Sequence, residues 1–356
     1  MLGMKLVKSM YVVLWAGLFL WILSCDKKSP VPHTQGADFN QRVDSFFIQA
    51  AIPPYKQDSV SQIYVNPIVQ NTGADAVAPA IGDVIYVRYS LAVLNGTSMD
   101  TIVFSSQVPQ SIPAGYGIHA IYPVGIDKGI EVSGMKSGDT YAFILPPDMG
   151  YGSFVLDPVI PENAILQVIL TLDSVKNVQA LRDQEILLIN RKIIDWELND
   201  TIKWPGTLVS RINVLNSTLA YKVLGDALPT GAQVADSSRV NVSFTTQYLD
   251  STLQSSFELK YASQPLEFVW GTDPVLIGFQ TGLQQMHVGE QALFIAPFDL
   301  TYHESVQIFP HVSGFRNTYF DALYDHLRAN KIIPAYGFEI EPFRSLLFKA
   351  KLNSIE

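Results

Sequence analysis

The chain of 356 residues is long enough for two ordinary domains, and 48% of its residues are hydrophobic. Only 16% are charged, against about 25% in an average domain, so the composition is that of a core-forming globular chain and excludes a disordered one. The net charge is −9 and no basic stripe is present, which disfavours nucleic-acid binding.

The N-terminus has the pattern of an export signal. Lys5 and Lys8 precede an almost wholly apolar run over residues 10–23, and Cys25 follows it. The run is too short for a typical membrane-spanning helix. It resembles a bacterial lipoprotein signal, which implies that residues 1–24 are a signal peptide and that Cys25 is lipidated. The alternative is an uncleaved anchor with an incidental cysteine.

Cys25 is the only cysteine in the chain, so no disulfide can form within it. Lipid chains at this position would hold the protein at a membrane surface without spanning it. Residues 25–38 contain two prolines and a glycine and are predicted to be a mobile tether. We therefore expect an exported protein, lipid-anchored to a bacterial membrane, with the periplasmic or surface face of the outer membrane as its expected place.

Two stretches with helical spacing each precede a set of strand-like segments. The first helix is predicted over residues 39–51, which end before two prolines, and the second over residues 178–199. Alternating segments follow each helix in the same order, namely 61–65 and 82–89 after the first and 217–224 and 240–244 after the second.

Further segments of the two halves also match. Residues 135–139 correspond to residues 286–290, and residues 164–172 correspond to residues 345–352. The period is far longer than that of a solenoid repeat, so we predict a tandem duplication of one helix-plus-sheet module. The predicted modules cover residues 39–176 and 177–356, with an insertion near 298–332 that has no counterpart in the first copy.

The clearest motif begins at Pro265. Pro265, Phe268 and Gly271 form a strand end, residues 275–279 follow, and residues 282–290 read Gly-Leu-Gln-Gln-Met-His-Val-Gly-Glu. This order and spacing resembles the signature of the FKBP-type peptidyl-prolyl isomerases. The resemblance spans roughly residues 59–175 and 217–355, which are most of the mature chain. It implies an α+β fold with two FKBP-like modules, each an antiparallel β-sheet wrapped around a short α-helix, with an extra N-terminal helix on each.

The resemblance also implies a site without nucleophile, metal or cofactor. The barrier to prolyl isomerisation comes from amide resonance and is about 18–20 kcal/mol. A site that removes water and packs apolar walls around the proline lowers this barrier. Such a site consists of aromatic and aliphatic side chains with a hydroxyl group and often a carboxylate. Without the family spacing, the same side chains would be assigned to core packing.

In the first copy, the family positions fall on Tyr89, Asp100 and Tyr151. The resemblance implies that the Tyr151 hydroxyl donates to the substrate carbonyl and that Asp100 is a polar group at the pocket rim. Ile126 stands where the family has a tryptophan floor. The implied substrate-binding residues of this copy are Met99, Ile126, Ile160 and Val168.

In the second copy, the family positions imply Tyr336 as the catalytic hydroxyl. Phe244 lacks the hydroxyl that Tyr89 has, and Glu258 is one methylene longer than an aspartate. The insertion enters beside Tyr336, where it is expected to form a lid or to fill the cleft. The implied substrate-binding residues of this copy are Phe244, Phe257, Glu258, Leu266, Val275, Leu276, Phe279, Ile340 and Phe348.

The predicted function is a peptidyl-prolyl isomerase that assists the folding of exported, proline-containing polypeptides at a membrane surface. The alternative is a catalytically degenerate chaperone or protein-binding lipoprotein, because neither copy keeps every landmark. A third reading has one active and one structural copy. A homodimer formed through the two N-terminal helices stays open. His303 and His311 match no defensible metal spacing, so no metal site is predicted.

Overall fold

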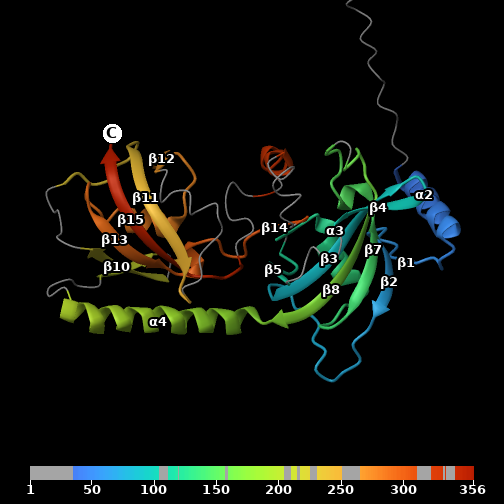
Figure 1. The fold of residues 1–356 in the computed structure, drawn as a ribbon, viewed down its shortest axis with the longest axis horizontal. Helices are drawn as coiled ribbons and strands as arrows, with labels where there is room; N and C mark the ends of the chain where they lie inside the picture. The colour runs from blue at the N-terminus through green and yellow to red at the C-terminus, as the bar shows by residue number, and fades with distance from the viewer. Residues whose placement is uncertain are drawn as a thin grey trace, which may run out of the picture. The chain divides into compact units, whose positions relative to one another are not determined.

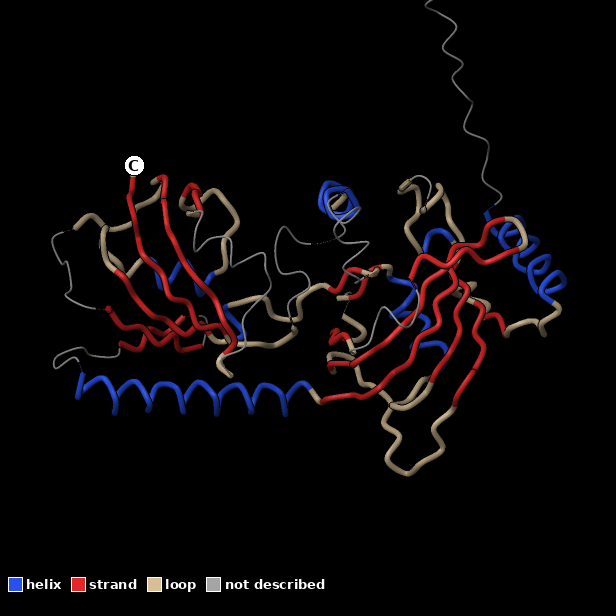
Figure 2. Tube along the Cα trace, in the orientation of Figure 1, coloured by secondary structure: helices blue, strands red, loops and turns tan. Residues whose placement is uncertain are grey.

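The computed structural model confirms the predicted α+β class, with two antiparallel sheets that each carry a short helix (Figures 1 and 2). Residues 46–356 form one compact unit that contains both sheets. The structure describes residues 35–103, 111–118, 120–156, 159–203, 210–214, 217–224, 231–250, 265–310, 322–331, 333 and 341–356.

The first sheet has the strand order β1-β2-β7-β8-β3-β4, with β5 also paired to β3. Its neighbouring strands run antiparallel, and the long strand β3 lies between β8 and β4. Helix α3, Val124–Ser133, packs on β7. The strands are β1 Lys56–Gln57, β2 Tyr64–Val69, β3 Val84–Asn95, β4 Ser98–Val103, β5 Ile112–Gly115, β7 Thr140–Leu145 and β8 Leu166–Lys176.

The second sheet has the strand order β12-β11-β15-β13-β10-β9. Helix α6, Ile277–Leu283, packs on β13, β10 and β15. The central order β2-β7-β8-β3 of the first sheet recurs here as β10-β13-β15-β11, which confirms the two copies. The strands are β9 Ser210–Val214, β10 Ser217–Leu224, β11 Arg239–Tyr248, β12 Leu266–Val269, β13 Gln291–Ala296 and β15 Leu346–Ile355.

The turn between helix and strand is built in the same way in both copies. Gly138 and Gly289 have φ angles of 88° and 92°, a conformation that glycine adopts without steric cost. Each is followed by a buried carboxylate, Asp139 or Glu290, which accepts backbone N–H groups of its own turn. The carboxylates satisfy donors that burial would otherwise leave without partners, so the Gly-acid pair defines this turn.

Each short helix approaches its sheet closely because it presents a glycine to a phenylalanine ring. A Cβ atom added at Gly129 would lie 3.0 Å from the ring of Phe143. At Gly282 it would lie 2.6 Å from the ring of Phe294. Both phenylalanines are fully buried on the strand that follows the helix. The same glycine therefore sets the distance between helix and sheet in the two modules.

Two longer helices precede the sheets. Helix α2, Gln35–Ala50, brings the Phe47 ring to 5.0 Å from that of Tyr55 and 5.7 Å from that of Tyr64. Helix α4, Val178–Lys203, directly follows β8, and the Asn177 side chain accepts the backbone N–H groups of Gln179 and Ala180 as its N-terminal cap.

Helix α4 packs on the second sheet through side chains spaced three or four apart. This spacing places them on one face of the helix. The buried cluster between helix and sheet contains Ile189, Ile193, Trp196, Ala220, Leu249, Ile295 and Leu347. In the part of the chain that the structure describes, no helix is long and apolar enough to cross a membrane. Cys25 lies outside the described residues.

The later part of the insertion, from residue 306 on, packs into the first module where it is described. Strand β14, Gln307–Ile308, pairs in parallel with β6, Ile121–Tyr122. Residues 322–329 are helical. The insertion was expected to form a lid or to fill the cleft beside Tyr336, which lies outside the described residues. Leu300, near the start of the insertion, belongs to the second module's core, whereas the buried side chains that follow belong to the first module's core. These side chains are Ile308, Phe309, Leu323, Leu327 and Ile333.

Candidate functional site

The first module gathers most of its predicted site residues into one buried cluster. Tyr89 comes from β3, Ile126 from α3 and Val168 from β8, while Tyr151 and Ile160 come from the loop between β7 and β8. Each of the five is at most 2% exposed. The sheet, the helix and the loop therefore bring two tyrosines and three aliphatic side chains into the same apolar region.

The Tyr151 hydroxyl donates a hydrogen bond of 2.7 Å to the backbone carbonyl of Phe309. Burial raises the pKa of Tyr151 well above its ordinary value, and the nearby Tyr89 and Tyr122 hydroxyls add to the shift. The hydroxyl therefore keeps its proton throughout the physiological pH range and remains a donor. The accepting carbonyl belongs to the peptide bond between Phe309 and Pro310.

Other aromatic rings surround this hydrogen bond. The rings of Tyr89 and Phe309 meet edge to face with centroids 4.6 Å apart. The Tyr151 ring lies 5.7 Å from Tyr122 and 6.4 Å from Phe154. Burial raises the pKa of Tyr122 to about 12. Neither Tyr122 nor Phe154 was predicted from the sequence as a site residue. Two features of the sequence could have indicated them: Tyr122 is an aromatic residue directly before Pro123, and Phe154 is an aromatic residue three positions after Tyr151.

The backbone of the insertion is also held at this place. The N–H of Gln307 donates to the carbonyl of Ala120, and the N–H of Phe309 donates to the carbonyl of Tyr122, both at 2.8 Å. The peptide bonds Tyr122–Pro123 and Phe309–Pro310 are both cis.

Met99 and Asp100 lie near the end of the β3–β4 hairpin. Met99 is partly exposed and Asp100 is exposed, and the Asp100 carboxylate accepts a hydrogen bond of 2.7 Å from Asn95. Among the described β4 residues, only Val103 is buried, and it belongs to the core cluster. The described hydrogen bond of the Asp100 carboxylate is thus to its own hairpin, and its role at the rim stays a prediction.

In the second module, the predicted aromatic residues pack on one another. Phe279 lies 4.6 Å from Phe244 and 5.1 Å from Phe348, and Phe294 lies 5.1 Å from Phe348, measured between ring centroids. All four rings are buried. Leu276 is buried in the same cluster, and Leu266 and Val275 pack against it while partly exposed. Phe257, Glu258, Tyr336 and Ile340 lie outside the described residues.

The structure identifies Tyr302 as the counterpart of Tyr151. Short 3₁₀ helices, Pro147–Met149 and Phe298–Leu300, follow β7 and β13 at the same place. The pattern Pro-x-Asp-x-x-Tyr ends at Tyr151 in the first module and at Tyr302 in the second. Tyr302 is partly buried and packs against the second core cluster. This spacing was the signal that could have found Tyr302.

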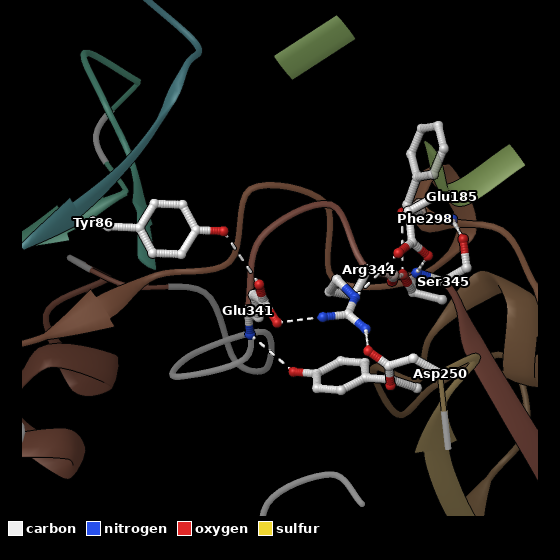
Figure 3. Close-up of polar contacts among 9 residues, drawn as sticks. Tyr86, Glu185, Asp250, Phe298, Glu341, Arg344 and Ser345 are labelled. Carbon is white, nitrogen blue, oxygen red and sulfur yellow. Dashed lines mark hydrogen bonds and ion pairs between the residues drawn. The ribbon is translucent and has the colours of Figure 1, made fainter. Parts of the chain in front are cut away.

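A network of charged side chains lies beside the second sheet (Figure 3). Arg344 pairs with Glu341, with Asp250 at 2.7 Å and with Glu185 of α4 at 3.1 Å. Burial raises the pKa of Glu185, although the Ser345 N–H and Arg344 oppose this shift. The network joins α4 to the segment before β15, so it is suited to a structural role, namely holding this helix against the second module.

The first module also contacts this network. The Tyr86 hydroxyl of β3 donates to the Glu341 carboxylate at 3.4 Å. Burial raises the pKa of Tyr86 to about 12, with the Glu341 charge as a further cause. Among the described side chains, no group of three or more His, Cys, Asp or Glu residues is placed to hold a metal ion.

Two solved structures are similar to the chain over long stretches. The crystal structure of the three FKBP domains of wheat FKBP73 is 16% identical, covers 83% of this chain and 94% of that chain, and gives a TM-score of 0.28. The crystal structure of FkpA from Escherichia coli is 19% identical, covers 49% of this chain and 74% of that chain, and gives a TM-score of 0.31.

The sequence profile of the FKBP-type peptidyl-prolyl cis-trans isomerases matches residues 76–173 and 231–353, which together make up more than half of the chain. The two matched ranges contain both short helices and most of the strands, while β1 and β2 precede the first range and β9 and β10 precede the second. The chain therefore belongs to the FKBP-type peptidyl-prolyl cis-trans isomerase family and carries two copies of its domain.

Proposed function

We propose that the chain is a peptidyl-prolyl isomerase that assists the folding of exported polypeptides. One observation carries the proposal: a buried tyrosine hydroxyl, Tyr151, donates to the carbonyl of a residue that precedes a proline, at 2.7 Å. FKBP-type domains act on proline-containing polypeptides, and this is the carbonyl of the bond that such an enzyme rotates. The counterpart Tyr302 offers a second candidate hydroxyl.

Rotation about the prolyl bond makes and breaks no covalent bond. The enzyme has to lower a barrier of about 18–20 kcal/mol that comes from amide resonance. Apolar walls such as Ile126 and Val168 exclude water, which otherwise stabilises the planar amide. A hydroxyl held by packing fixes the carbonyl while the proline side of the bond turns. Catalysis then consists of desolvation and positioning.

The test is an isomerisation assay with a proline peptide. The double variant Tyr151→Phe with Tyr302→Phe should lower kcat/KM about fivefold, since one hydrogen bond is worth about 1 kcal/mol. Tyr116→Phe is the matched control, because this core tyrosine has no hydroxyl hydrogen bond to the described residues. If neither the unsubstituted chain nor chains with Phe309→Asp or Phe309→Ala accelerate isomerisation, the enzyme proposal is wrong.

The cellular setting is part of the same proposal. The apolar run before Cys25, and the absence of any other cysteine, support export followed by lipidation at Cys25. Mass spectrometry of the protein from its native membrane should show a lipid-modified N-terminal cysteine, and Cys25→Ser should release the protein from the membrane fraction. An unmodified cysteine would contradict the anchor. A homodimer through α2 and α4 stays a prediction.

A second candidate function has one observation in its favour. Phe244 replaces a tyrosine, and its ring packs against Phe279 and Phe348. A module whose rings fill its own site is suited to binding or support more than to catalysis. If the chain suppresses aggregation of an unfolded protein but does not accelerate isomerisation, the chaperone function is the correct one.

A further inference from the structure

Residues 306–310 follow the second module's strand β13, yet they occupy the first module's candidate site. Ile308 and Phe309 are fully buried, and both belong to the cluster that contains Tyr89, Tyr151 and Ile126. Pro310 is buried as well. A surface insertion normally covers its own domain with polar side chains. This one places an apolar Ile-Phe-Pro run in the neighbouring module.

The backbone of this segment is held as an added strand. The N–H group of Gln307 donates to the carbonyl of Ala120, just before β6, and the N–H group of Phe309 donates to the carbonyl of Tyr122 in β6. Within the described residues, β6 pairs with no strand other than β14. Extended peptides bind to free strand edges through main-chain bonds of this kind, while side-chain pockets supply specificity.

The side chains complete the resemblance to a bound peptide. Phe309 meets the Tyr89 ring edge to face at 4.6 Å, and its carbonyl accepts the Tyr151 hydroxyl at 2.7 Å. Pro310 follows this carbonyl directly. The hydroxyl and the aromatic wall that an external proline peptide would need are therefore already engaged by a proline-containing segment of the same chain.

We propose that residues 306–310 are an intramolecular ligand of the first module's site, and that they must leave before an external proline peptide binds there. The inference rests on the proposed function, because it takes the Tyr151 hydroxyl as the group that holds a substrate carbonyl. A tethered ligand competes at an effective concentration that reaches the millimolar range. It lowers the apparent affinity for a client by the fraction of time in which the site is open.

The first experiment asks whether removing the ligand increases activity. In the full chain, Phe309→Asp places a charge that an apolar site rejects, and Phe309→Ala is the milder variant. If the site is open about one-tenth of the time, kcat/KM for a Phe-Pro peptide should rise about tenfold. The rise should disappear when Tyr151→Phe is added. Phe298→Ala, a buried phenylalanine outside the site, should give no rise.

The second experiment measures occupancy without catalysis. A fluorescent peptide with the sequence of residues 304–310 should bind the Phe309→Asp chain at least tenfold more tightly than the unsubstituted chain. The same peptide with Pro310→Ala should bind less tightly. If the Phe309→Asp chain does not fold, Phe309→Ala replaces it in this measurement, because it removes the ring without adding a charge.

The outcomes separate the inference from the proposed function. Tighter peptide binding by the variants, without isomerisation by any chain, supports the intramolecular ligand and refutes the enzyme. Equal peptide binding by variant and unsubstituted chains overturns the intramolecular ligand. Tyr151-dependent activity that is the same with and without the Phe309 substitutions also overturns it, while the enzyme proposal stands.

Discussion

At equivalent places in the two modules, the first has Ile126 and Val168 where the second has Phe279 and Phe348. The first module's apolar cluster takes in an additional ring, that of Phe309, from the insertion. The second module's cluster is built from its own phenylalanines. One cluster thus takes in a ring from elsewhere in the chain, and the other is built from the side chains of its own sheet and helix.

The strand registers show that these positions are truly equivalent. Val168 pairs with a phenylalanine on β7, and Phe348 pairs with one on β13. Two residues after Val168 on β8, Leu170 pairs with Tyr89 of β3. Two residues after Phe348 on β15, Ala350 pairs in the same way with Phe244 of β11. The scaffold has therefore been kept while the site has changed. The copy with the stronger family signature has lost the tyrosine hydroxyl on its second strand.

The largest expected difference comes from truncating the last strand of each site. Phe348→Ala should lower the free energy of unfolding by about 3–5 kcal/mol, because its buried ring contacts Phe279 and Phe294. Val168→Ala removes two carbons and should cost about 1–2 kcal/mol. Urea unfolding measures both. A larger loss at Val168 than at Phe348 would contradict the conclusion that the second cluster depends on the packing of its own rings.

A second comparison concerns two tyrosines of the first module's core, one with and one without a hydroxyl hydrogen bond to the described residues. Tyr151→Phe leaves the buried Phe309 carbonyl without its donor, which should cost about 1–3 kcal/mol. Tyr116→Phe in the same core is the control and should cost less, as its hydroxyl has no hydrogen bond to the described residues. Thermal unfolding of the two variants makes the measurement. Equal losses would show that the hydrogen bond to the insertion contributes nothing.

A third comparison uses the glycines under the two helices. Alanine at position 282 would place its Cβ 2.6 Å from the Phe294 ring, and overpacking of this kind costs about 1–3 kcal/mol. The better helix propensity of alanine returns about 1 kcal/mol. We expect a net loss of about 1 kcal/mol for Gly282→Ala and less for Gly129→Ala, where the distance is 3.0 Å. A more stable Gly282→Ala variant in urea would contradict the close approach.

Local patterns were enough to predict the scaffold. The Gly-acid turns at residues 138–139 and 289–290, and the matching order of strands, come from short-range chemistry that repeats at a recognisable spacing. The spacing to Tyr302 was equally local and was overlooked because Tyr336-Gly337 resembled the family motif more closely. Duplication made the prediction easier, since each half supports the reading of the other.

The place of the insertion could not be predicted in this way. Its contacts join residues separated by more than 150 positions, such as Tyr151 and Phe309, and no periodicity encodes them. The length of the first hairpin is a second feature that was not predicted from the sequence. Strand β3 continues to Asn95, so that Met99 and Asp100 lie near the hairpin end and Val103 becomes the buried position.

The smallest expected difference lies at one cross-strand pair. In the first module, Arg88 binds Asp173 through two hydrogen bonds of 2.5 and 2.7 Å, and at the equivalent place of the second module Asn353 donates to Ser243. The Arg88 hydrogen bond lowers the pKa of Asp173. Because Arg88 is about half exposed, the pair should contribute less than about 1 kcal/mol.

The sign of the pH effect separates this pair from its neutral counterpart. A carboxyl with a lowered pKa in the folded state stabilises the fold above its unfolded pKa, and this contribution is lost as the pH falls through the folded pKa. The loss caused by Asp173→Asn should therefore be greatest at neutral pH and shrink toward about pH 3. The loss caused by Asn353→Ala in the second module should not follow the pH. The measurement is urea unfolding of each variant between neutral pH and about pH 3. If the stability lost through Asp173→Asn is the same at every pH, the charge of Asp173 does not stabilise the fold.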